Sequence, residues 1–494
     1  MLLLKRANEL LAENKLREAE FMFKSVLKQS PKNGPALFGL GRICMRLEQY
    51  DNAIYYLKRA CEHLPKMLDP LFALADAFIA VGSPVDAKTV LEYTLSVAKH
   101  NAQAHYQLGQ FYLDYGFVEQ AEKVFREGVN CPHGTVTGFM LYELAQMSAV
   151  NELEGYLELL DKLVAESETP RLKVVLFYAQ AKCHERLGNL KQAEEFYQQA
   201  NETQLTLAEF KTEQMLPLFD SIKKWCNKAF FDKPADKVKT TFTPVFIVGL
   251  PRTGSTLLEQ MLIQHPEVGT LGENTVISDK IVPYLCQRNE AHFPNCLHTL
   301  SNSMLDHCRG LYVDEIKRQR VAKSVVINKL PANFQNLGLI HKLFPEGRII
   351  HLSRNLKATA WSVYSNHFAA NEPYFCSMSE FALYAQAEHD LMTHFKQFLK
   401  HDIFSLSYEQ LIAEPERYIK RCLNFLYLEY DPECLSFYKS KKPVHTLSKA
   451  QVRQPINTTG LEKWQRHADF ITEQLPDPEP SPPEHTEQTT QVSP

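Results

Sequence analysis

One stretch of the chain, residues 245–262, reads VFIVGLPRTGSTLLEQML. The apolar run at 245–248 predicts a buried strand, and apolar residues recur at helical spacing over 257–262. Between these two segments lies a turn with glycine at both ends, 249–254. The stretch therefore predicts a strand, a tight loop and a helix in succession.

This glycine loop has the features of an anion-binding site. It precedes a helix N-terminus, where backbone N–H groups lack intrahelical partners and the macrodipole is positive. Arg252 lies inside the loop, and the hydroxyl residues Thr253, Ser255 and Thr256 follow it. These groups could hold a phosphate or a sulfonate. The loop alone also allows an ordinary glycine turn that caps a helix.

The spacing G-x-x-x-x-G matches the phosphate-binding loop of nucleoside triphosphatases, with one difference. Those proteins need a lysine after the second glycine, and this chain has Ser255 there. The missing lysine would reach the terminal phosphates and carry part of the charge that develops on them. The sequence therefore disfavours a nucleotide kinase or a triphosphatase.

The composition is that of an ordinary globular protein: 494 residues, of which 45% are hydrophobic, with room for about two to four domains. A net charge of −4 gives no sign of nucleic-acid binding. The N-terminus lacks the long apolar core of a secretory signal, and no apolar run approaches the roughly 20 residues of a membrane helix. We therefore expect a cytoplasmic protein without a membrane span.

The first part of the chain is periodic. Alanine recurs at Ala19, Ala53, Ala87 and Ala121, an interval of about 34 residues, and other small and large residues repeat at the same offsets. A divergent unit follows before the pattern returns. This periodicity resembles the tetratricopeptide repeat, a helix–turn–helix unit that stacks into a superhelix. The resemblance covers about residues 1–205.

Such superhelices commonly bind a partner, but the sequence does not identify it. Many bind a peptide in a concave groove, whereas others serve as oligomerisation surfaces or as rigid supports for a neighbouring domain. A protein or peptide in the repeat groove is therefore one expectation, and the oligomeric state stays open. Residues 206–243 are expected to form a connecting helix and a linker.

After the glycine loop, short β-rich runs alternate with helical patterns. Such alternation predicts right-handed crossovers and a mainly parallel sheet covered by helices. The expected fold is an α-solenoid of repeats followed by an α/β domain similar to the P-loop fold. Further strands are predicted at 325–328, 348–353 and 403–407, and helices at 255–265, 334–344, 356–368 and 381–399.

Polar side chains follow the predicted strands. Lys329 comes after one strand, Arg354 after the next with Ser362 eight residues further on, and Tyr408 after the last. Ligands of parallel sheets bind at the carboxyl ends of the strands, so these residues and the glycine loop would surround one edge. Such a set of cations and hydroxyls suits a ligand with more than one phosphate-like group.

These residues resemble the binding sites of sulfotransferases that use 3′-phosphoadenylyl sulfate. The glycine loop, with His265-Pro266 and Gly272-Glu273 after it, is similar to their 5′-phosphosulfate loop. The segment that ends in Arg354, with Ser362, is similar to their 3′-phosphate site. The similarity is nearest to bacterial sulfotransferases with tetratricopeptide repeats, and more distant to the tyrosylprotein sulfotransferases.

The resemblance implies a set of donor-binding residues and a catalytic set. It implies that Glu273 is the candidate base, with a neighbouring residue as the alternative because the match shifts by one residue between His265-Pro266 and Gly272-Glu273, and that Lys329 and Arg252 stabilise the departing phosphate. No metal is expected, because side-chain cations can do what Mg²⁺ does for nucleoside triphosphates. The residues expected to bind the donor are Arg252, Thr253, Gly254, Ser255, Thr256, Arg354, Ser362, Tyr408, Ser448, Arg453 and Lys463.

Two positions depart from the family pattern. Many relatives have Asp-Pro after the arginine, where this chain has Asn355-Leu356, and many have Asp before the lysine, where it has Asn328. Neither change removes a phosphate ligand, but each could alter how the cation is oriented. We expect the sulfotransferase domain over 244–474, with a disordered proline-rich tail over 475–494.

The expected activity is the transfer of a sulfuryl group from 3′-phosphoadenylyl sulfate to an acceptor hydroxyl. A tyrosine in a protein or peptide, a carbohydrate, a lipid and a small metabolite all offer such an oxygen, and the repeats favour a polypeptide. The alternative is an interaction scaffold of tetratricopeptide repeats whose second domain binds the nucleotide without catalysis.

Overall fold

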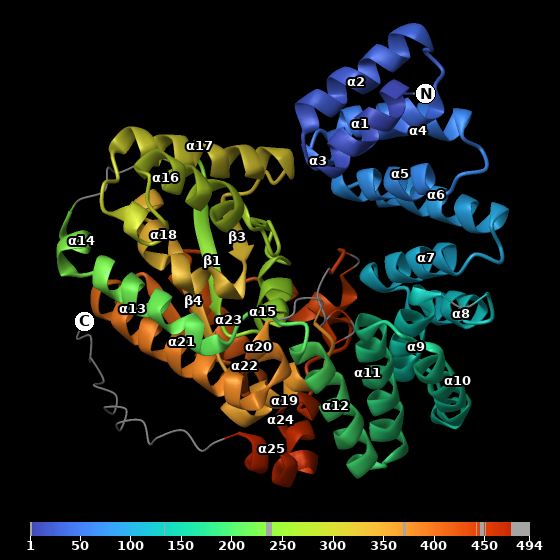
Figure 1. Cartoon of the computed structure of the whole chain (residues 1–494). Helices are drawn as coiled ribbons and strands as arrows, with labels where there is room; N and C mark the ends of the chain where they lie inside the picture. Colours follow the sequence, from blue (N-terminus) through green and yellow to red (C-terminus); the bar gives the residue numbers. More distant parts are fainter. Residues whose placement is uncertain are drawn as a thin grey trace.

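The computed structural model describes residues 2–132, 134–233, 240–368, 372–440, 442–444, 449 and 451–475. Helical hairpins stack into an arc along one side of the molecule, from the N-terminus to residue 205 (Figure 1). Their helices are α1 (Leu2–Ala12), α2 (Leu16–Gln29), α3 (Gly34–Arg46), α4 (Tyr50–His63), α5 (Asp69–Ala80), α6 (Pro84–Val97), α7 (Ala102–Asp114), α8 (Val118–Gly128), α9 (Thr135–Met147), α10 (Leu153–Glu166), α11 (Pro170–Leu187) and α12 (Leu190–Leu205).

The periodic small residues lie where the helices of a hairpin pack closely. Ala19, Ala53, Ala87 and Ala121 are all fully buried. At Gly109 in α7, a Cβ atom would lie 2.2 Å from the ring of Phe125 in α8. The repeated positions are thus those where a small residue allows two helices to pack in direct contact. The expected solenoid is confirmed.

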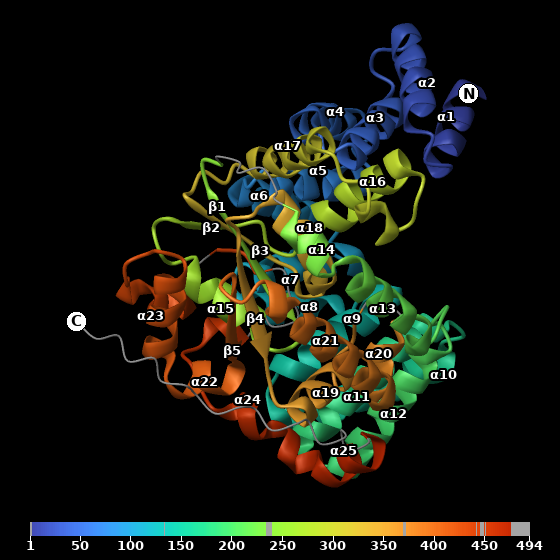
Figure 2. The same cartoon turned by 90° about the vertical axis from the view of Figure 1, so that its left-hand side faces the viewer.

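Five parallel strands form the sheet of the second part, in the order β2-β3-β1-β4-β5. Figure 2 shows this sheet with the repeats behind it. The expected mainly parallel α/β fold is therefore confirmed. The strands are β1 (Thr243–Gly249), β2 (Val268–Thr270), β3 (Val325–Lys329), β4 (Arg348–Ser353) and β5 (Ile403–Ser407).

Helices cover both faces of the sheet. Alternate residues of β1 point to opposite sides, so that Phe246 and Val248 enter one core while Val245 and Ile247 enter another. This double burial explains why β1 reads as a continuous apolar run. The helices of this part are α13 (Leu216–Trp225), α14 (Lys228–Asp232), α15 (Ser255–Leu262), α16 (Val282–Asn289), α17 (Asn302–Arg318), α18 (Leu337–Leu343), α19 (Leu356–Tyr364), α20 (Pro373–Cys376), α21 (Met378–Phe398), α22 (Tyr408–Ala413), α23 (Pro415–Phe425), α24 (Thr459–Glu462) and α25 (Ala468–Gln474).

Shorter turns of helix connect these elements. They are 3₁₀ turns apart from Ile277–Ile281, which is a π-helix that leads into α16. The 3₁₀ turns are η1 (Val150–Glu152), η2 (Thr212–Gln214), η4 (Asn295–Leu297), η5 (Pro331–Asn336), η6 (Pro432–Lys439), η7 (Gln451–Arg453) and η8 (Lys463–His467).

Most predicted elements are present; α15 and α19 end earlier than predicted, whereas α21 begins three residues earlier than the predicted helix at 381–399. The strands predicted at 348–353 and 403–407 have those bounds, whereas the helix predicted at 334–344 is a 3₁₀ turn followed by α18. β2 was not predicted, because a strand of three residues is too short to show a hydrophobic period.

The repeats and the α/β part share one hydrophobic core. Buried side chains of α9, α11 and α12 form a single cluster with Trp361 and Tyr364 of α19 and Phe381 of α21. Asn201 of α12 also donates a hydrogen bond of 2.9 Å to the carbonyl of Tyr364. The solenoid and the α/β part are therefore held together by a shared hydrophobic core and by a hydrogen bond between them. Among the described helices, none is long and apolar enough to cross a membrane.

Candidate functional site

The glycine loop follows β1 and depends on two unusual backbone conformations. Gly249 has a φ of 140° and Gly254 a φ of 94°. A Cβ atom at Gly249 would lie 2.3 Å from the carbonyl oxygen of Leu352 in β4, and one at Gly254 would lie 2.6 Å from the ring of Tyr408. Glycine therefore lets the loop pass close to β4 and to Tyr408 as the chain enters α15.

The hydroxyl residues of the loop are buried at the start of α15. The Thr253 hydroxyl donates a hydrogen bond of 2.8 Å to the carbonyl of Leu250, which closes the turn. Ser255 and Thr256 form the first turn of α15, where the macrodipole favours an anion. The loop thus has the geometry that its sequence predicts.

Arg252 reaches from the loop to α19. Its Nε atom donates a hydrogen bond of 3.0 Å to the hydroxyl of Ser362. Burial, together with the positive charge of Arg354, lowers the pKa of Arg252 to about 10. The guanidinium stays charged at neutral pH, although its buried surroundings disfavour that charge.

Arg354 packs against the loop from the end of β4. One of its Nη atoms donates to the carbonyl of Arg252 at 3.0 Å, and the other donates to the carbonyl of Gly460. The guanidinium also lies 4.6 Å from the centre of the Tyr408 ring. Burial lowers the pKa of Arg354 and raises that of Tyr408. Arg252, Arg354, Ser362 and Tyr408 therefore lie side by side.

Lys329, the last residue of β3, is completely buried beside two carboxylates. Its Nζ atom lies 2.5 Å from Oε1 of Glu273 and 3.7 Å from Oε2 of Glu259. The backbone N–H of Lys329 donates to the carbonyl of Gly272 at 3.0 Å, which fixes the turn before Glu273. The Glu273 side chain is 47% exposed and can be reached by a substrate.

Glu259 on α15 is a residue that sequence reasoning missed. Its Oε1 atom accepts a hydrogen bond of 2.5 Å from the Thr270 hydroxyl. Burial raises the pKa of this carboxyl, and the nearby charge of Lys329 opposes that rise. A signal was present in the sequence, since Glu259 lies between the core residues Leu258 and Met261. A charged residue in a buried helix needs a partner.

The predicted residues nearest the C-terminus have other partners. Lys463 forms an ion pair of 3.2 Å with Glu185 on repeat helix α11. Arg453 donates to backbone carbonyls of Asp114, Ser440 and Lys442, and so ties its segment to the end of α7. A direct contact of Arg453 with phosphate therefore requires that these bonds break. Ser448 lies outside the described residues.

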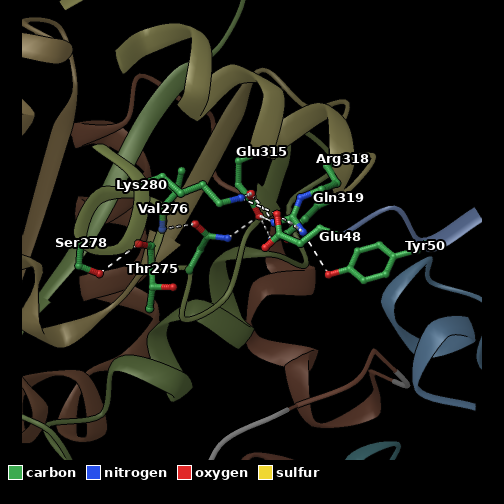
Figure 3. Close-up of polar contacts among 10 residues, drawn as sticks. Glu48, Tyr50, Thr275, Val276, Ser278, Lys280, Glu315, Arg318 and Gln319 are labelled. Atoms are coloured by element: carbon green, nitrogen blue, oxygen red, sulfur yellow. Dashed lines mark hydrogen bonds and ion pairs between the residues drawn. The ribbon is translucent and has the colours of Figure 1, made fainter. Parts of the chain in front are cut away.

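A cavity of about 450 Å³ opens between the repeats and the α/β part, with Glu273 in its wall. Figure 3 shows the polar contacts on one side of this cavity, where Glu48 of the repeats meets Lys280 and Arg318. The lining residues are Glu48, Tyr50, Ile79, Ala80, Val81, Gly82, Leu271, Glu273, Asn274, Thr275, Glu315, Arg318 and Gln319.

The charged groups of this cavity wall are paired. Glu48 lies 2.5 Å from Lys280 and 2.9 Å from Arg318, and Arg318 also pairs with the buried carboxylate of Glu315. Asn274 donates a hydrogen bond of 2.7 Å to Glu315. The cavity is therefore lined by paired charged groups, among them Glu273 with Lys329, and by the apolar end of α5. Over the part of the chain that the structure describes, no cluster of three metal-ligating side chains is present.

The arrangement around the loop brings three features together: an arginine in a glycine loop, a second arginine with a serine, and a lysine–glutamate pair. Comparison with known proteins gives matches for both parts of the chain. Residues 244–432 match the model of the sulfotransferase family, and residues 4–67 and 175–205 match models of the tetratricopeptide repeat. The chain joins tetratricopeptide repeats to a sulfotransferase-family domain.

Several curated relatives match part of the chain. An uncharacterized protein of Aquifex aeolicus is 31% identical over 237 residues, which are 46% of this chain and 31% of that protein. Protein-tyrosine sulfotransferase 1 of Danio rerio is 25% identical over 237 residues, which are 44% of this chain and 65% of the relative. The matched part of the chain thus spans 31% and 65% of the length of these two relatives.

Solved structures also resemble parts of the chain. The sulfotransferase domain from the Synechococcus PCC 7002 olefin synthase has 18% identity and a TM-score of 0.35, and the match covers 47% of this chain and 91% of that domain. The protein named MamA has 17% identity and a TM-score of 0.27, and the match covers 41% of this chain and 97% of that one.

Proposed function

We propose that the chain transfers a sulfuryl group from 3′-phosphoadenylyl sulfate to an acceptor hydroxyl. The observation that carries this proposal is the direct contact between the glycine loop and the residues after β4. Arg252 bonds to Ser362, and Arg354 bonds to the Arg252 carbonyl. A nucleotide with phosphates at both its 5′ and its 3′ positions would meet both groups at once.

On the donor side, each residue has a role that follows from its chemistry. The loop N–H groups with Ser255 and Thr256 would hold the 5′-phosphosulfate at the α15 N-terminus. Arg354 and Ser362 would hold the 3′-phosphate, since arginine offers a planar two-pronged donor and serine a short one. The Tyr408 ring is placed to contact the nucleotide beside Arg354.

For the transfer, the Glu273–Lys329 pair supplies the base and a cation. The acceptor oxygen forms a bond to sulfur as the bond from sulfur to the bridging phosphate oxygen breaks, and Glu273 takes the acceptor proton. The negative charge that gathers on adenosine 3′,5′-bisphosphate would be stabilised by Lys329 and Arg252. Glu259 keeps Lys329 neutralised and positioned before the donor arrives.

The acceptor would reach Glu273 through the cavity between the repeats and the α/β part. Its volume suits a side chain or a small molecule rather than a folded protein. A tyrosine carried on a peptide is the acceptor we propose, because protein-tyrosine sulfotransferases are among the relatives and repeats of this class bind proteins.

A transfer assay with labelled donor tests this function. The purified protein would be incubated with 3′-phosphoadenylyl [³⁵S]sulfate and acceptors that include tyrosine peptides, sugars and simple phenols. We expect label in at least one acceptor, loss of transfer in Glu273→Gln, and normal transfer in the exposed control Glu346→Gln. Nucleotide binding without transfer to any acceptor would favour the scaffold instead.

A further inference from the structure

One lysine of the repeats faces the arginine loop. Lys182 lies on α11 with only 5% of its surface exposed. Its ammonium lies 5.4 Å from the centre of the Tyr197 ring on α12. Among the residues that the structure describes, no hydrogen bond or ion pair to this ammonium is found. Protonation of a buried amine without an anion beside it is costly, so a lysine in this place suggests an anionic ligand.

The other charges around Lys182 do not supply that anion. Burial lowers the pKa of Lys182 to about 7, and the positive charges of Lys463 and Arg252 add to this effect. Glu185, on the same helix, acts in the opposite direction. However, the Glu185 carboxylate is already engaged by Lys463 at 3.2 Å and lies 3.6 Å from His467. Around Lys182, therefore, Lys463 and Arg252 disfavour a charged amine and Glu185 favours it.

Aromatic contacts connect Lys182 with α19, the helix that carries Ser362. The Tyr197 ring that covers Lys182 also lies 5.4 Å from the ring of Trp361 on α19. Trp361 precedes Ser362, whose hydroxyl is bonded to Arg252. Lys182 is thus joined through Tyr197 and Trp361 to α19, the helix that carries Ser362, and it lies close enough to Arg252 for that charge to lower its pKa.

We propose that Lys182 of the repeats binds the 3′-phosphate of the nucleotide donor together with Ser362. This inference rests on the proposed function, because it needs a donor with a 3′-phosphate. It gives the tetratricopeptide repeats a second role, which is to complete the nucleotide site. The repeats would then be required for donor binding itself, and not only for capture of a partner protein.

Proton uptake is the signature of this contact. In the free protein Lys182 is largely neutral at pH 8, above its pKa of about 7. A phosphate dianion beside the amine raises the pKa, so the lysine takes up a proton as the nucleotide binds. The phosphate is itself fully ionised at pH 8, since its second pKa is about 6. The groups that face Lys182 are Arg252 of the loop, Lys463, Glu185 and Tyr197.

Calorimetry of the full-length protein at pH 8 tests the proposal. Adenosine 3′,5′-bisphosphate is titrated in two buffers with different ionisation enthalpies, so that the difference in heat gives the protons taken up. The wild type is expected to take up most of one proton. Lys182→Met is expected to bind on the order of tenfold more weakly without uptake. Lys182→Arg, which stays charged at all these pH values, should bind well without uptake.

The control and the outcomes separate this inference from the proposed function. Lys191→Met, an exposed change on α12, should match the wild type. If the wild type does not bind adenosine 3′,5′-bisphosphate, the proposed function itself is wrong. If the wild type binds, and Lys182→Met binds equally well with the same proton uptake, the role of Lys182 is wrong while the proposed function stands.

Discussion

The Nε atom of Arg252 lies 3.0 Å from the hydroxyl oxygen of Ser362, although 110 residues separate them in the sequence. This bond joins the glycine loop after β1 to α19 after β4. Because β1 and β4 are neighbours and run parallel, their carboxyl ends open at the same edge of the sheet. A single anionic ligand at this edge would contact both residues.

The cavity beside Glu273 can be blocked without touching the nucleotide site. Ala80, at the end of α5, lines this cavity. Ala80→Trp is expected to abolish transfer to the acceptor and to leave the affinity for adenosine 3′,5′-bisphosphate unchanged, as measured by labelled-sulfate transfer and calorimetry. The same change at Ala165, exposed on α10, should have neither effect. Normal transfer in Ala80→Trp would exclude the cavity as the route of the acceptor.

The ion pair between Arg318 and Glu315 should contribute to stability. The Glu315 side chain is 1% exposed, so Arg318→Ala leaves a buried charge with fewer partners. We expect a loss of about 3 kcal/mol in urea unfolding, the low end for a broken buried pair, because Arg318 is 24% exposed and Lys280 remains 3.5 Å away. Arg320→Ala, at a site that is 65% exposed, should cost less than about 1 kcal/mol. Equal losses would contradict this reading.

The same carboxylate predicts a pH dependence. Burial alone would raise the pKa of Glu315, but its bonds with Arg318, Gln319 and Asn274 lower it overall. A lowered pKa stabilises the fold above the unfolded pKa of about 4.3, and this stabilisation is lost as pH falls through the folded pKa. The difference in unfolding free energy between the wild type and Glu315→Gln should therefore shrink from pH 7 to pH 4. A difference that stayed constant would contradict the assignment.

Gly249 is expected to tolerate no side chain. A Cβ atom there would meet the backbone oxygen of Leu352, which cannot move without disturbing the pairing of β1 with β4. Gly249→Ala should cost at least about 2 kcal/mol in thermal or urea unfolding. Gly155 lies in α10 with no atom within 4 Å of an added Cβ. Gly155→Ala should stabilise the protein by about 0.5–1 kcal/mol, since alanine favours a helix.

Predictions from the sequence were most successful where they depended on a pattern of neighbouring residues, such as a repeat interval or the end of a strand. The alanines at Ala19 and Ala53 predicted helical hairpins because a repeated interval needs no knowledge of distant contacts. The rule for strand ends placed Arg252, Lys329 and Arg354 at one edge of a sheet, and the structure places them there. Their catalytic and binding roles stay predictions.

Contacts between distant segments could not be predicted from the sequence. Lys182 and Glu185 look like ordinary helix residues of a repeat, and only the fold brings them against Lys463 and Arg252. The repeat period likewise gives no sign that α11 and α12 share a core with Trp361. Such contacts depend on how two parts of the chain pack, which periodicity cannot report.

The central claim is that one nucleotide contacts both the loop and the Arg354–Ser362 group. The most direct measurement is calorimetric titration of the wild type, Arg354→Ala and Arg252→Ala with adenosine 3′,5′-bisphosphate and with adenosine 5′-phosphate. We predict that the wild type prefers the bisphosphate, that Arg354→Ala loses this preference, and that Arg252→Ala weakens both ligands. No binding of the bisphosphate by the wild type, or equal affinity for the two nucleotides, would contradict the claim.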